Sequence, residues 1–402
     1  MRFLYTCYFF IFTLSIALAQ VSAYCDFDER YHSDATYSEQ VQKILDNLPK
    51  HNFEERAIVE IPVVVHIVYR LEEDNISDEQ VFEQIEILNK AFNGQALTDA
   101  DIPSEFLQSV TTVNFKFCLA NTDPDGNLVT GITRKEVETI NIGSLDRIYY
   151  DAQGGVDAWD TDRYINIWVA ETNNDIIGKA SFPGIGPEEE QGIVMDVQYF
   201  GGPNSLNFDD RYLGGKSLIH EMGHYFGLQH LWGSTVSDCD SDDGIEDTPV
   251  TGTTYVNSCQ LNGVSCGSVD MTGNYMMYSS DNCLHYFTKG QRTLMHNVLN
   301  VYRNGLRSTS ITCTAMEEES EELGFKLIKR GANGLVLDID GQGLDSVLEA
   351  SLYDLSGKLI WSNQQIIDQE FFYLPMKNKS PGVYVVVLSN ASSFSAQKFF
   401  WH

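Results

Sequence analysis

The run from His220 to His230 constrains the fold of this chain more than any other feature. It reads His-Glu-Met-Gly-His-Tyr-Phe-Gly-Leu-Gln-His, so that His220 and His224 are four residues apart. On an α-helix that spacing places both imidazoles on one face, where they can bind a single ion. Gly227 can adopt a positive φ and end the helix, so that the chain doubles back and presents His230 as a third ligand.

These three histidines predict a catalytic zinc site. Three neutral nitrogen ligands leave one position open for water, which is the arrangement of catalytic zinc sites and not of closed structural ones. Glu221 lies beside the ligands, where it can accept a proton from a bound water molecule. The alternative is three core histidines on an apolar helix. It is disfavoured because a chance match to all five specified positions has an expectation below about 10⁻⁴.

The composition describes an acidic globular protein. The chain has 402 residues, with 57 acidic and 26 basic groups and a formal net charge of −31. Such an excess argues against nucleic acid and anionic membrane surfaces as partners. Hydrophobic residues at 43% and charged residues at 21% are typical of a folded protein, and the length suits two or three domains.

Residues 1–23 read as a secretory signal peptide. Arg2 precedes an apolar run from Phe9 to Ala19 and small residues follow, so cleavage is expected after Ala19 or Ala23. An N-terminal membrane anchor is the alternative, and the shortness of the apolar run disfavours it. No later segment is apolar enough to cross a bilayer. We therefore expect a mature chain without a transmembrane segment, secreted or held at the cell surface by other means.

Strand and helix patterns alternate early in the chain and predict an α/β fold with a twisted sheet. Apolar runs predict strands at 58–69, 113–120, 164–170 and 192–198. Ser77 is expected to cap a helix that runs to Phe92 and has one apolar face. A final helix is expected over 288–302, with Thr288 and Gln291 as a capping box.

The chain is expected to divide into five segments. The N-terminal polar segment carries one weak amphipathic helix at 37–48 and reads as a propeptide, with a disordered tether as the alternative. Short strands at regular spacing near the C-terminus predict a small all-β sandwich. The segments are a signal peptide at 1–23, the propeptide-like segment at 24–57, a catalytic domain at 58–313, an acidic linker at 314–324 and the β-sandwich at 325–402.

The extended histidine motif is the metzincin signature, and the text around it resembles the pappalysin-like metallopeptidases, which include the cytophagalysins. This resemblance covers residues 58–302 and implies a mixed α/β (α+β) catalytic domain with a zinc helix. The matching text, besides the zinc motif, is Ile61-Pro-Val-Val-Val-His66, Asp157-Ala-Trp-Asp160, Asn166-Ile-Trp-Val169, Asp247-Thr-Pro249, Asn274-Tyr-Met276 and Phe287-Thr with Gln291.

The resemblance also implies roles for residues outside the zinc motif. Met276 is similar to the Met-turn residue that underlies the metal, and Tyr278 to the tyrosine that binds the oxyanion. Glu221 would accept the proton of a zinc-activated water and pass it to the leaving amine. Members often carry Asp after that methionine, whereas Met277 stands here, which bears on local packing. Asp281 follows closely and is a candidate for the pocket after the scissile bond, where it would favour Arg or Lys. A surface carboxylate is the alternative.

The long irregular stretch at 232–284 is expected to need disulfide bonds or bound ions to be stable. Of the eight cysteines, Cys7 leaves with the signal peptide and an odd number remains. Export favours disulfides, and one thiol is then left over. The resemblance implies the pairs Cys239–Cys266 and Cys259–Cys283, although the sequence alone permits other pairings.

An acidic loop at 240–248 lies within the same stretch and is a candidate calcium site. Its carboxylates and backbone carbonyls are the oxygen ligands that calcium prefers. Relatives bind calcium about here, which makes Asp243, Asp247 and Thr248 the candidate ligands. The loop lacks the EF-hand pattern, and a solvated acidic loop is the alternative.

Cys25 precedes the catalytic domain and has two interpretations. In some relatives a propeptide cysteine is a fourth zinc ligand that keeps the enzyme latent. The alternative is a disulfide from Cys25 to Cys313 or Cys118. The text Tyr24-Cys-Asp-Phe does not match the motif expected of such a switch.

The C-terminal segment resembles the sorting domains that type IX secretion systems recognise. The resemblance implies the type IX secretion machinery as a partner, while a generic adhesion or carbohydrate-binding module is the alternative. The matching text is Tyr353-Asp-Leu-Ser-Gly-Lys358, Pro381-Gly-Val-Tyr-Val385 and Gln397-Lys-Phe-Phe400.

Together these observations predict a secreted zinc endopeptidase that acts on extracellular proteins or peptides. The second interpretation is a non-catalytic surface binding protein on a metzincin scaffold. Intact Glu221 and Tyr278 argue against it. An enzyme acting on another amide, such as a sugar N-acetyl group, has no positive feature in this sequence.

Overall fold

The computed structural model divides the chain into two compact units, Met1–Thr314 and Ala315–His402. In the first unit it describes residues 24–307, apart from 50–56, 96–101, 174–175, 204, 208, 234 and 237. In the second it describes strands and a few adjoining residues between 325 and 401. The expected signal peptide and acidic linker lie outside the described residues. Across the described parts, no helix has both the length and the apolarity to cross a membrane.

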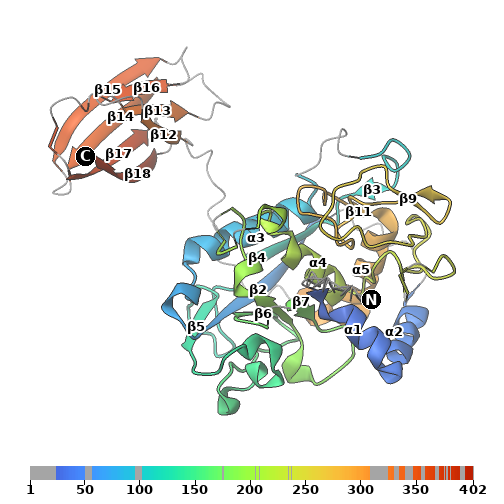
Figure 1. Cartoon of the computed structure of the whole chain (residues 1–402). Coiled ribbons are helices and arrows are strands. Elements are labelled where there is room, and N and C mark those ends of the chain that lie inside the picture. Colours follow the sequence, from blue (N-terminus) through green and yellow to red (C-terminus); the bar gives the residue numbers. More distant parts are fainter. Residues whose placement is uncertain are drawn as a thin grey trace, which may run out of the picture. The chain divides into compact units, whose positions relative to one another are not determined.

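The first unit is built on a seven-stranded, mainly parallel sheet (Figure 1). Its order is β1-β7-β8-β6-β2-β4, with β5 also paired to β2. The β7–β8 pair is antiparallel, and the other pairs are parallel. The predicted α/β class is therefore confirmed for this unit. The strands are β1 (Tyr24–Cys25), β2 (Val59–Tyr69), β4 (Phe115–Leu119), β5 (Ile132–Glu136), β6 (Ile165–Ala170), β7 (Ile176–Ala180) and β8 (Ile193–Asp196).

The sheet is buried on both faces, as a mainly parallel sheet must be. Alternate residues of β2, such as Val63 and Val65, pack into the larger core together with α3 (Asp78–Phe92). Val68 faces the other way and packs with Trp168 in a second cluster. The predicted N-cap of α3 is confirmed, because the Ser77 hydroxyl accepts a hydrogen bond from the Gln80 N–H at 3.2 Å.

Two further helices complete the larger core. They are α4 (Lys216–Tyr225) and α5 (Lys289–Val301), which bury Met222 and Val298, among others, in that cluster. The predicted capping box of α5 is present, with the Thr288 side chain bound to the Gln291 N–H and the Gln291 side chain bound to the Thr288 N–H. Short 3-10 helices lie in the connections: Glu72–Asp74, Ile142–Ser144, Asp146–Tyr149, Asp151–Gln153, Glu188–Glu190, Val197–Tyr199, Asp210–Tyr212 and Asn304–Arg307.

The stretch between α4 and α5 is irregular, as the sequence predicts. It contains β9 (Val264–Ser265), β10 (Ser268–Val269) and β11 (Phe287–Thr288), and β11 pairs with β3 (Val110–Thr111). Two disulfides hold it, Cys239–Cys266 and Cys259–Cys283, with Cα–Cα distances of 5.4 and 5.3 Å. These are the two pairs that the resemblance implies.

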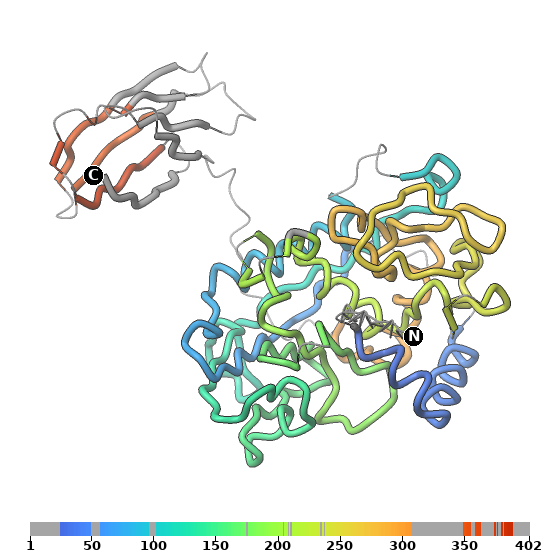
Figure 2. The backbone as a smooth tube through the Cα atoms, in the orientation of Figure 1, coloured from blue at the N-terminus to red at the C-terminus, as the bar shows by residue number. Residues whose placement is uncertain are grey.

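The N-terminal segment is more ordered than the sequence predicts. Instead of one weak helix it forms α1 (Asp26–Ser33) and α2 (Ala35–Asn47), with Asp34 capping α2. Phe27 and Val41 pack with Phe182 of the catalytic unit. Helix α1 lies beside β7 (Figure 1), and the blue tube of this segment lies along the lower right side of the unit (Figure 2). The alternative of a disordered tether is wrong for residues 24–49.

The second unit contains two antiparallel sheets within its described residues. One has the order β12-β13-β16 and the other β15-β14-β17-β18. Ala350, Leu352, Val386 and Leu388 are buried within it. The strands are β12 (Phe325–Lys329), β13 (Leu335–Ile339), β14 (Val347–Asp354), β15 (Leu359–Ile366), β16 (Phe371–Leu374), β17 (Gly382–Ser389) and β18 (Phe394–Trp401).

Candidate active site

The three predicted ligand histidines converge in the structure. Helix α4 presents His220 and His224 on one face, with their Nε2 atoms 3.2 Å apart. Gly227 has a φ of +87° and ends the helix turn, as the sequence predicts. The chain then returns, and the Nε2 atom of His230 lies 3.0 Å from that of His220 and 3.1 Å from that of His224.

Hydrogen bonds to the second ring nitrogen orient each imidazole. An Nδ1–H donates to an oxygen in every case, so the Nε2 lone pairs point toward one another. Burial, followed by repulsion from His230, lowers the pKa of His220 to about 3, so that this ring is neutral. The acceptors are Tyr275 O for His220 at 2.8 Å, Leu228 O for His224 at 2.8 Å and Asp28 Oδ1 for His230 at 2.6 Å.

This donor set fits a zinc ion. Tetrahedral zinc at 2.0–2.1 Å from its nitrogen ligands separates those ligands by about 3.3 Å. The observed separations of 3.0–3.2 Å are close to that value, and three buried lone pairs facing one another need a cation between them. The Sγ atom of Cys25 joins the same group, whose ligand atoms all lie within 4.8 Å of one another.

Met276 lies directly beneath the ligand helix. A Cβ atom added at Gly223 would be 2.3 Å from the Met276 Sδ atom, so the close approach depends on glycine. The Asn274 side chain fixes this turn. Its Oδ1 atom accepts from the Met276 N–H at 3.0 Å and from the Gln291 side chain at 3.0 Å. The methionine therefore lies against the helix that carries His220 and His224.

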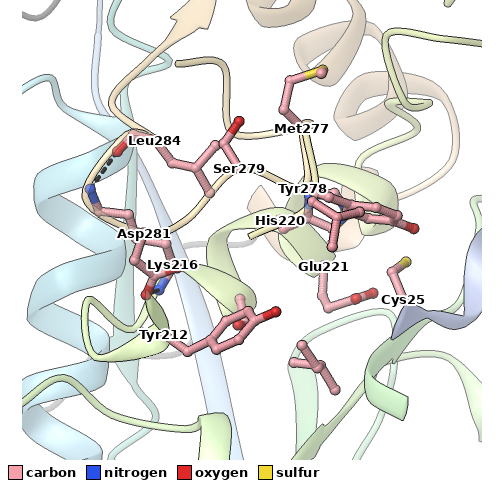
Figure 3. A pocket seen from close by; sticks show the side chains of 13 residues that line it. Cys25, Tyr212, Lys216, His220, Glu221, Met277, Tyr278, Ser279, Asp281 and Leu284 are labelled. Atoms are coloured by element: carbon pink, nitrogen blue, oxygen red, sulfur yellow. Dashed lines mark hydrogen bonds between the residues drawn. The ribbon is translucent and has the colours of Figure 1, made fainter. Parts of the chain in front are cut away.

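Glu221 points into the space beside the ligands (Figure 3). It is 2% exposed, and its Oε2 atom has no hydrogen-bond partner. Burial raises the pKa of Glu221 to about 8 in this arrangement, in which the Cys25 thiol lies beside it. Strand β7 packs closely against it, because a Cβ atom at Gly178 would lie 2.7 Å from the Glu221 Cγ atom.

Tyr278 lies against the ligand histidines. Its ring centroid is 4.8 Å from that of His230 and 5.5 Å from that of His220. The hydroxyl donates to Asp28 Oδ2 at 3.3 Å. Burial raises the pKa of Tyr278 well above its ordinary value, so this hydroxyl keeps its proton and can act as a hydrogen-bond donor.

The N-terminal segment enters the site through three residues. Cys25 has a free, buried thiol. Phe27 stacks on His224 with centroids 4.5 Å apart and an interplanar angle of 10°. Asp28 bridges His230 and Tyr278, as described above. Cys118 is engaged in another disulfide, so the alternative pairing of Cys25 is wrong.

Sequence analysis did not identify Phe27 or Asp28. Both sit in a polar helix about two hundred residues before the histidines they touch. No spacing rule connects them to the zinc motif, because their contacts arise only when the segment docks. The one available signal was the proximity of both residues to Cys25, which was itself a candidate ligand.

A pocket opens beside Glu221 and Tyr278, with Asp281 in its wall (Figure 3). Asp281 is 5% exposed, and its Oδ2 atom accepts from the N–H groups of Gly214 at 2.8 Å and Lys216 at 3.3 Å. Burial raises the pKa of Asp281 to about 6. The Lys216 ammonium donates to the Leu284 carbonyl in the same pocket. Other lining residues are Ile177, Tyr212, Ser217, Val256, Met277 and Ser279.

The acidic loop contains a buried carboxylate, Asp243, with an unpartnered oxygen. Asp243 is 3% exposed, its Oδ1 atom accepts from the Thr248 hydroxyl at 2.6 Å, and its Oδ2 atom has no partner. Burial raises the pKa of Asp243 to about 8. Asp247, in contrast, has hydrogen-bond partners for both of its carboxylate oxygens. Its two carboxylate oxygens accept from the Thr288 hydroxyl at 2.7 Å and the Gly290 N–H at 3.0 Å, at the start of α5.

Comparison with known proteins places this site in a family. Residues 149–300 match the Peptidase M43 family model, which is described as pregnancy-associated plasma protein-A. The structure resembles promirolysin of Tannerella forsythia, with 32% identity and a TM-score of 0.60, over 70% of this chain and 95% of that one. The chain belongs to the Peptidase M43 family.

Further matches agree with this family. Mature mirolysin of Tannerella forsythia, solved in complex with a cleaved peptide, is 34% identical, with a TM-score of 0.56, over 63% of this chain and 99% of that one. An extracellular metalloprotease of Arthroderma gypseum is 26% identical over 263 residues, which are 63% of this chain and 78% of the relative. Family membership makes this chain a metallopeptidase of metzincin type and implies zinc as its metal.

Proposed function

We propose that this chain is a secreted zinc endopeptidase that hydrolyses peptide bonds in extracellular proteins or peptides. The convergence of three imidazole nitrogens beside the buried carboxyl of Glu221 carries this proposal. Two similar proteins support this proposal. One is named an extracellular metalloprotease, and mature mirolysin holds a cleaved peptide.

The side chains of the site suit this reaction. His220, His224 and His230 would hold zinc, which when bound acidifies a water molecule and polarises the scissile carbonyl. Glu221 accepts the proton of the attacking water and passes it to the leaving amine. The Tyr278 hydroxyl donates a hydrogen bond to the developing oxyanion once Asp28 no longer holds it.

The proposal is tested with a mixed peptide library and the chain freed of its N-terminal segment. Cleavage identified by mass spectrometry and abolished by 1,10-phenanthroline is the expected result. An absence of cleavage with zinc and calcium supplied would overturn the proposal and favour the alternative of a non-catalytic binding protein.

The segment 24–57 is proposed to be a propeptide that keeps the enzyme latent, with the Cys25 thiol as a fourth ligand. Its support is the Cys25 Sγ atom among the histidine nitrogens, together with Phe27 on His224 and Asp28 on Tyr278. Intact Cys25→Ala protein is expected to cleave peptides without prior processing. If the intact Cys25→Ala protein is inactive while the processed enzyme is active, the thiol does not keep the enzyme latent.

Asp281 is proposed to favour Arg or Lys immediately after the scissile bond. Support comes from its place in the pocket beside Glu221 and Tyr278 (Figure 3). In Asp281→Asn enzyme, kcat/KM for peptides with Arg after the cut should fall at least tenfold relative to matched Leu peptides. An unchanged Arg-to-Leu ratio would contradict this role. The ratio corrects for any general loss caused by weaker hydrogen bonds from the Gly214 and Lys216 N–H groups.

Calcium is proposed to bind at the acidic loop, with Asp243 as its anchor and Thr248 and Asp247 as the other candidates. The support is the buried Asp243 carboxylate with one unpartnered oxygen. The hydrogen bonds of Asp247 to the start of α5 make it the weaker candidate of the two acids.

Export is proposed to use residues 1–23 as a signal peptide and residues 325–402 as a small all-β sandwich read by the type IX secretion machinery. The sequence motifs and the antiparallel strands of the second unit support this proposal. Deletion of residues 325–402 is expected to prevent surface delivery, measured by cell fractionation. Normal delivery of the truncated chain would favour an adhesion or carbohydrate-binding module.

A further inference from the structure

A second pocket lies on the opposite face of β7 from Glu221. The residue before Lys179, Gly178, faces Glu221, and successive residues of a strand point to opposite faces. Lys179 therefore points away from the ligand helix, toward the ring of Tyr149. The pocket is lined from the catalytic unit by Tyr149, Lys179, Ser181, Phe182, Ile185 and Glu190, and from the N-terminal helices by Arg30 and Tyr37.

Lys179 is a buried cation without a counterion in contact. It is 8% exposed, and its ammonium lies 5.1 Å from the centroid of the Tyr149 ring. Among the described residues, no carboxylate lies within 4.0 Å of this ammonium. A buried charge without a partner is costly, so this side chain favours a nearby anion. Burial lowers the pKa of Lys179. The carboxylates of Asp26, Asp146 and Glu190 oppose that effect, and the Arg30 guanidinium adds to it.

The N-terminal segment brings both a carboxylate, Asp26, and a guanidinium, Arg30, to this place. Strands β1 and β7 pair in parallel, with Cys25 opposite Gly178. Asp26 follows Cys25 directly and is the carboxylate that acts most strongly on Lys179. It does not bind Lys179, because its own ion pair is with Arg30 at 3.3 Å in α1. Removal of the segment takes both Asp26 and Arg30 away.

The order of residues along β7 indicates on which side of the scissile bond a substrate residue would meet Lys179. Ile177 lines the pocket that contains Asp281, which the proposed function places after the scissile bond. Gly178 lies at Glu221, where the reaction would occur. Lys179 and Ala180 continue past this point and line the second pocket. A peptide lying along β7 therefore presents residues before the scissile bond to Lys179.

We propose that Lys179, over the ring of Tyr149, forms a substrate subsite for an acidic side chain on the N-terminal side of the scissile bond. This rests on the proposed peptidase function. Glu190, which also lines the pocket, has its Oε1 atom bound by the Tyr150 hydroxyl at 2.6 Å. Lys179 is therefore the group left to meet an incoming carboxylate.

The test compares processed wild-type enzyme with Lys179→Met and Lys179→Arg variants. The substrates are quenched fluorescent peptides with one common scissile bond, in which Asp or the isosteric Asn is placed at each of the positions before the bond. Wild-type enzyme should prefer Asp at one of these positions by roughly tenfold in kcat/KM. Lys179→Met should lose this preference and Lys179→Arg should retain it, with the Asp-to-Asn ratio of kcat/KM compared within each enzyme.

Two results would overturn the subsite. One is equal cleavage of Asp and Asn peptides by the wild-type enzyme at every position. The other is a Lys179→Met variant that keeps the preference for Asp. If no enzyme cleaves even the all-neutral peptide, the proposed function itself fails, and the subsite falls with it. A merely structural role of Lys179 would lower all rates together and leave the Asp-to-Asn ratio unchanged.

Discussion

Replacing Asp243 by Asn should change how the stability of the catalytic unit depends on pH. The Asp243 carboxyl is 3% exposed, and burial raises its pKa from the ordinary 3.8 to about 8. Below about pH 4 both the folded and unfolded states bind the proton, so Asp243 does not affect their balance. Between about pH 4 and pH 8 only the folded state binds it, so rising pH destabilises the fold. Above about pH 8 the folded state carries the full cost of a buried charge.

The size of this effect follows from linkage. Each pKa unit corresponds to about 1.4 kcal/mol, so the full effect between pH 4 and pH 8 is on the order of 5 kcal/mol. The amide in Asp243→Asn has the same shape, and its oxygen can accept the hydrogen bonds from Thr248 and from the Ile245 N–H at 3.1 Å. It does not titrate. Calcium bound to the carboxylate would remove the cost in the original chain and would have no such effect in the variant.

The assay is urea unfolding followed by circular dichroism at several pH values, in EGTA and in calcium. A Glu221→Gln background prevents self-cleavage during the measurement. In EGTA, the unfolding free energy of Asp243→Asn relative to its parent should rise by about 1.4 kcal/mol per pH unit between pH 5 and pH 7. Calcium should stabilise the parent alone. Parallel pH profiles of the two proteins, together with no response to calcium, would refute the reasoning.

Two further substitutions test the packing around the site. Gly223→Ala places a methyl group 2.3 Å from the Met276 sulfur, so it should cost about 1–2 kcal/mol of stability and weaken zinc binding in a chelator competition. A second change, Met276→Ala, should restore part of both. A fully stable single variant would contradict the contact. Arg303→Met removes a guanidinium 3.4 Å from the Tyr225 ring centroid and leaves the carbonyls of Tyr225 and Ser181 unpaired, so it should cost about 3 kcal/mol in urea unfolding. The control Lys90→Met breaks only an exposed ion pair with Glu86 and should change stability by less than about 0.5 kcal/mol. Equal losses of stability in Arg303→Met and Lys90→Met would argue against a special role for Arg303.

The convergence of the three histidines could be predicted because their contacts are local. His220 and His224 are related by one turn of helix, and Gly227 supplies the φ of +87° that turns the chain toward His230. The helix caps at Ser77 and Thr288 are equally local and were predicted correctly. Buried strands such as β2 and β6 are long enough, and apolar enough, to be recognised by themselves.

The elements that the sequence did not reveal owe their structure to partners distant in the chain. Strand β7 contains Gly178 and Lys179 and has weak strand propensity, yet pairing with β8 and β1 holds it in place. Helix α1 is polar and acidic, and it docks through Phe27 on His224 and Asp28 on His230. These contacts depend on tertiary structure, which is why one weak helix was predicted where there are two.

The docked segment explains why this form of the site is closed. The Cys25 Sγ atom lies within 4.8 Å of the histidine ligand atoms. Asp28 holds the hydroxyl of Tyr278, and Phe27 covers His224. Asp28 also accepts a hydrogen bond from His230, and Glu221 faces the Cys25 thiol.

The most direct test of the central claim is the activity and metal content of processed Glu221→Gln enzyme. The amide keeps the size of the side chain but cannot accept the proton. The account predicts one zinc per chain by elemental analysis, as in the wild type, and a fall of about a thousandfold or more in kcat/KM on a peptide that the wild-type enzyme cleaves. Substantial remaining activity with zinc in place would contradict the role of Glu221.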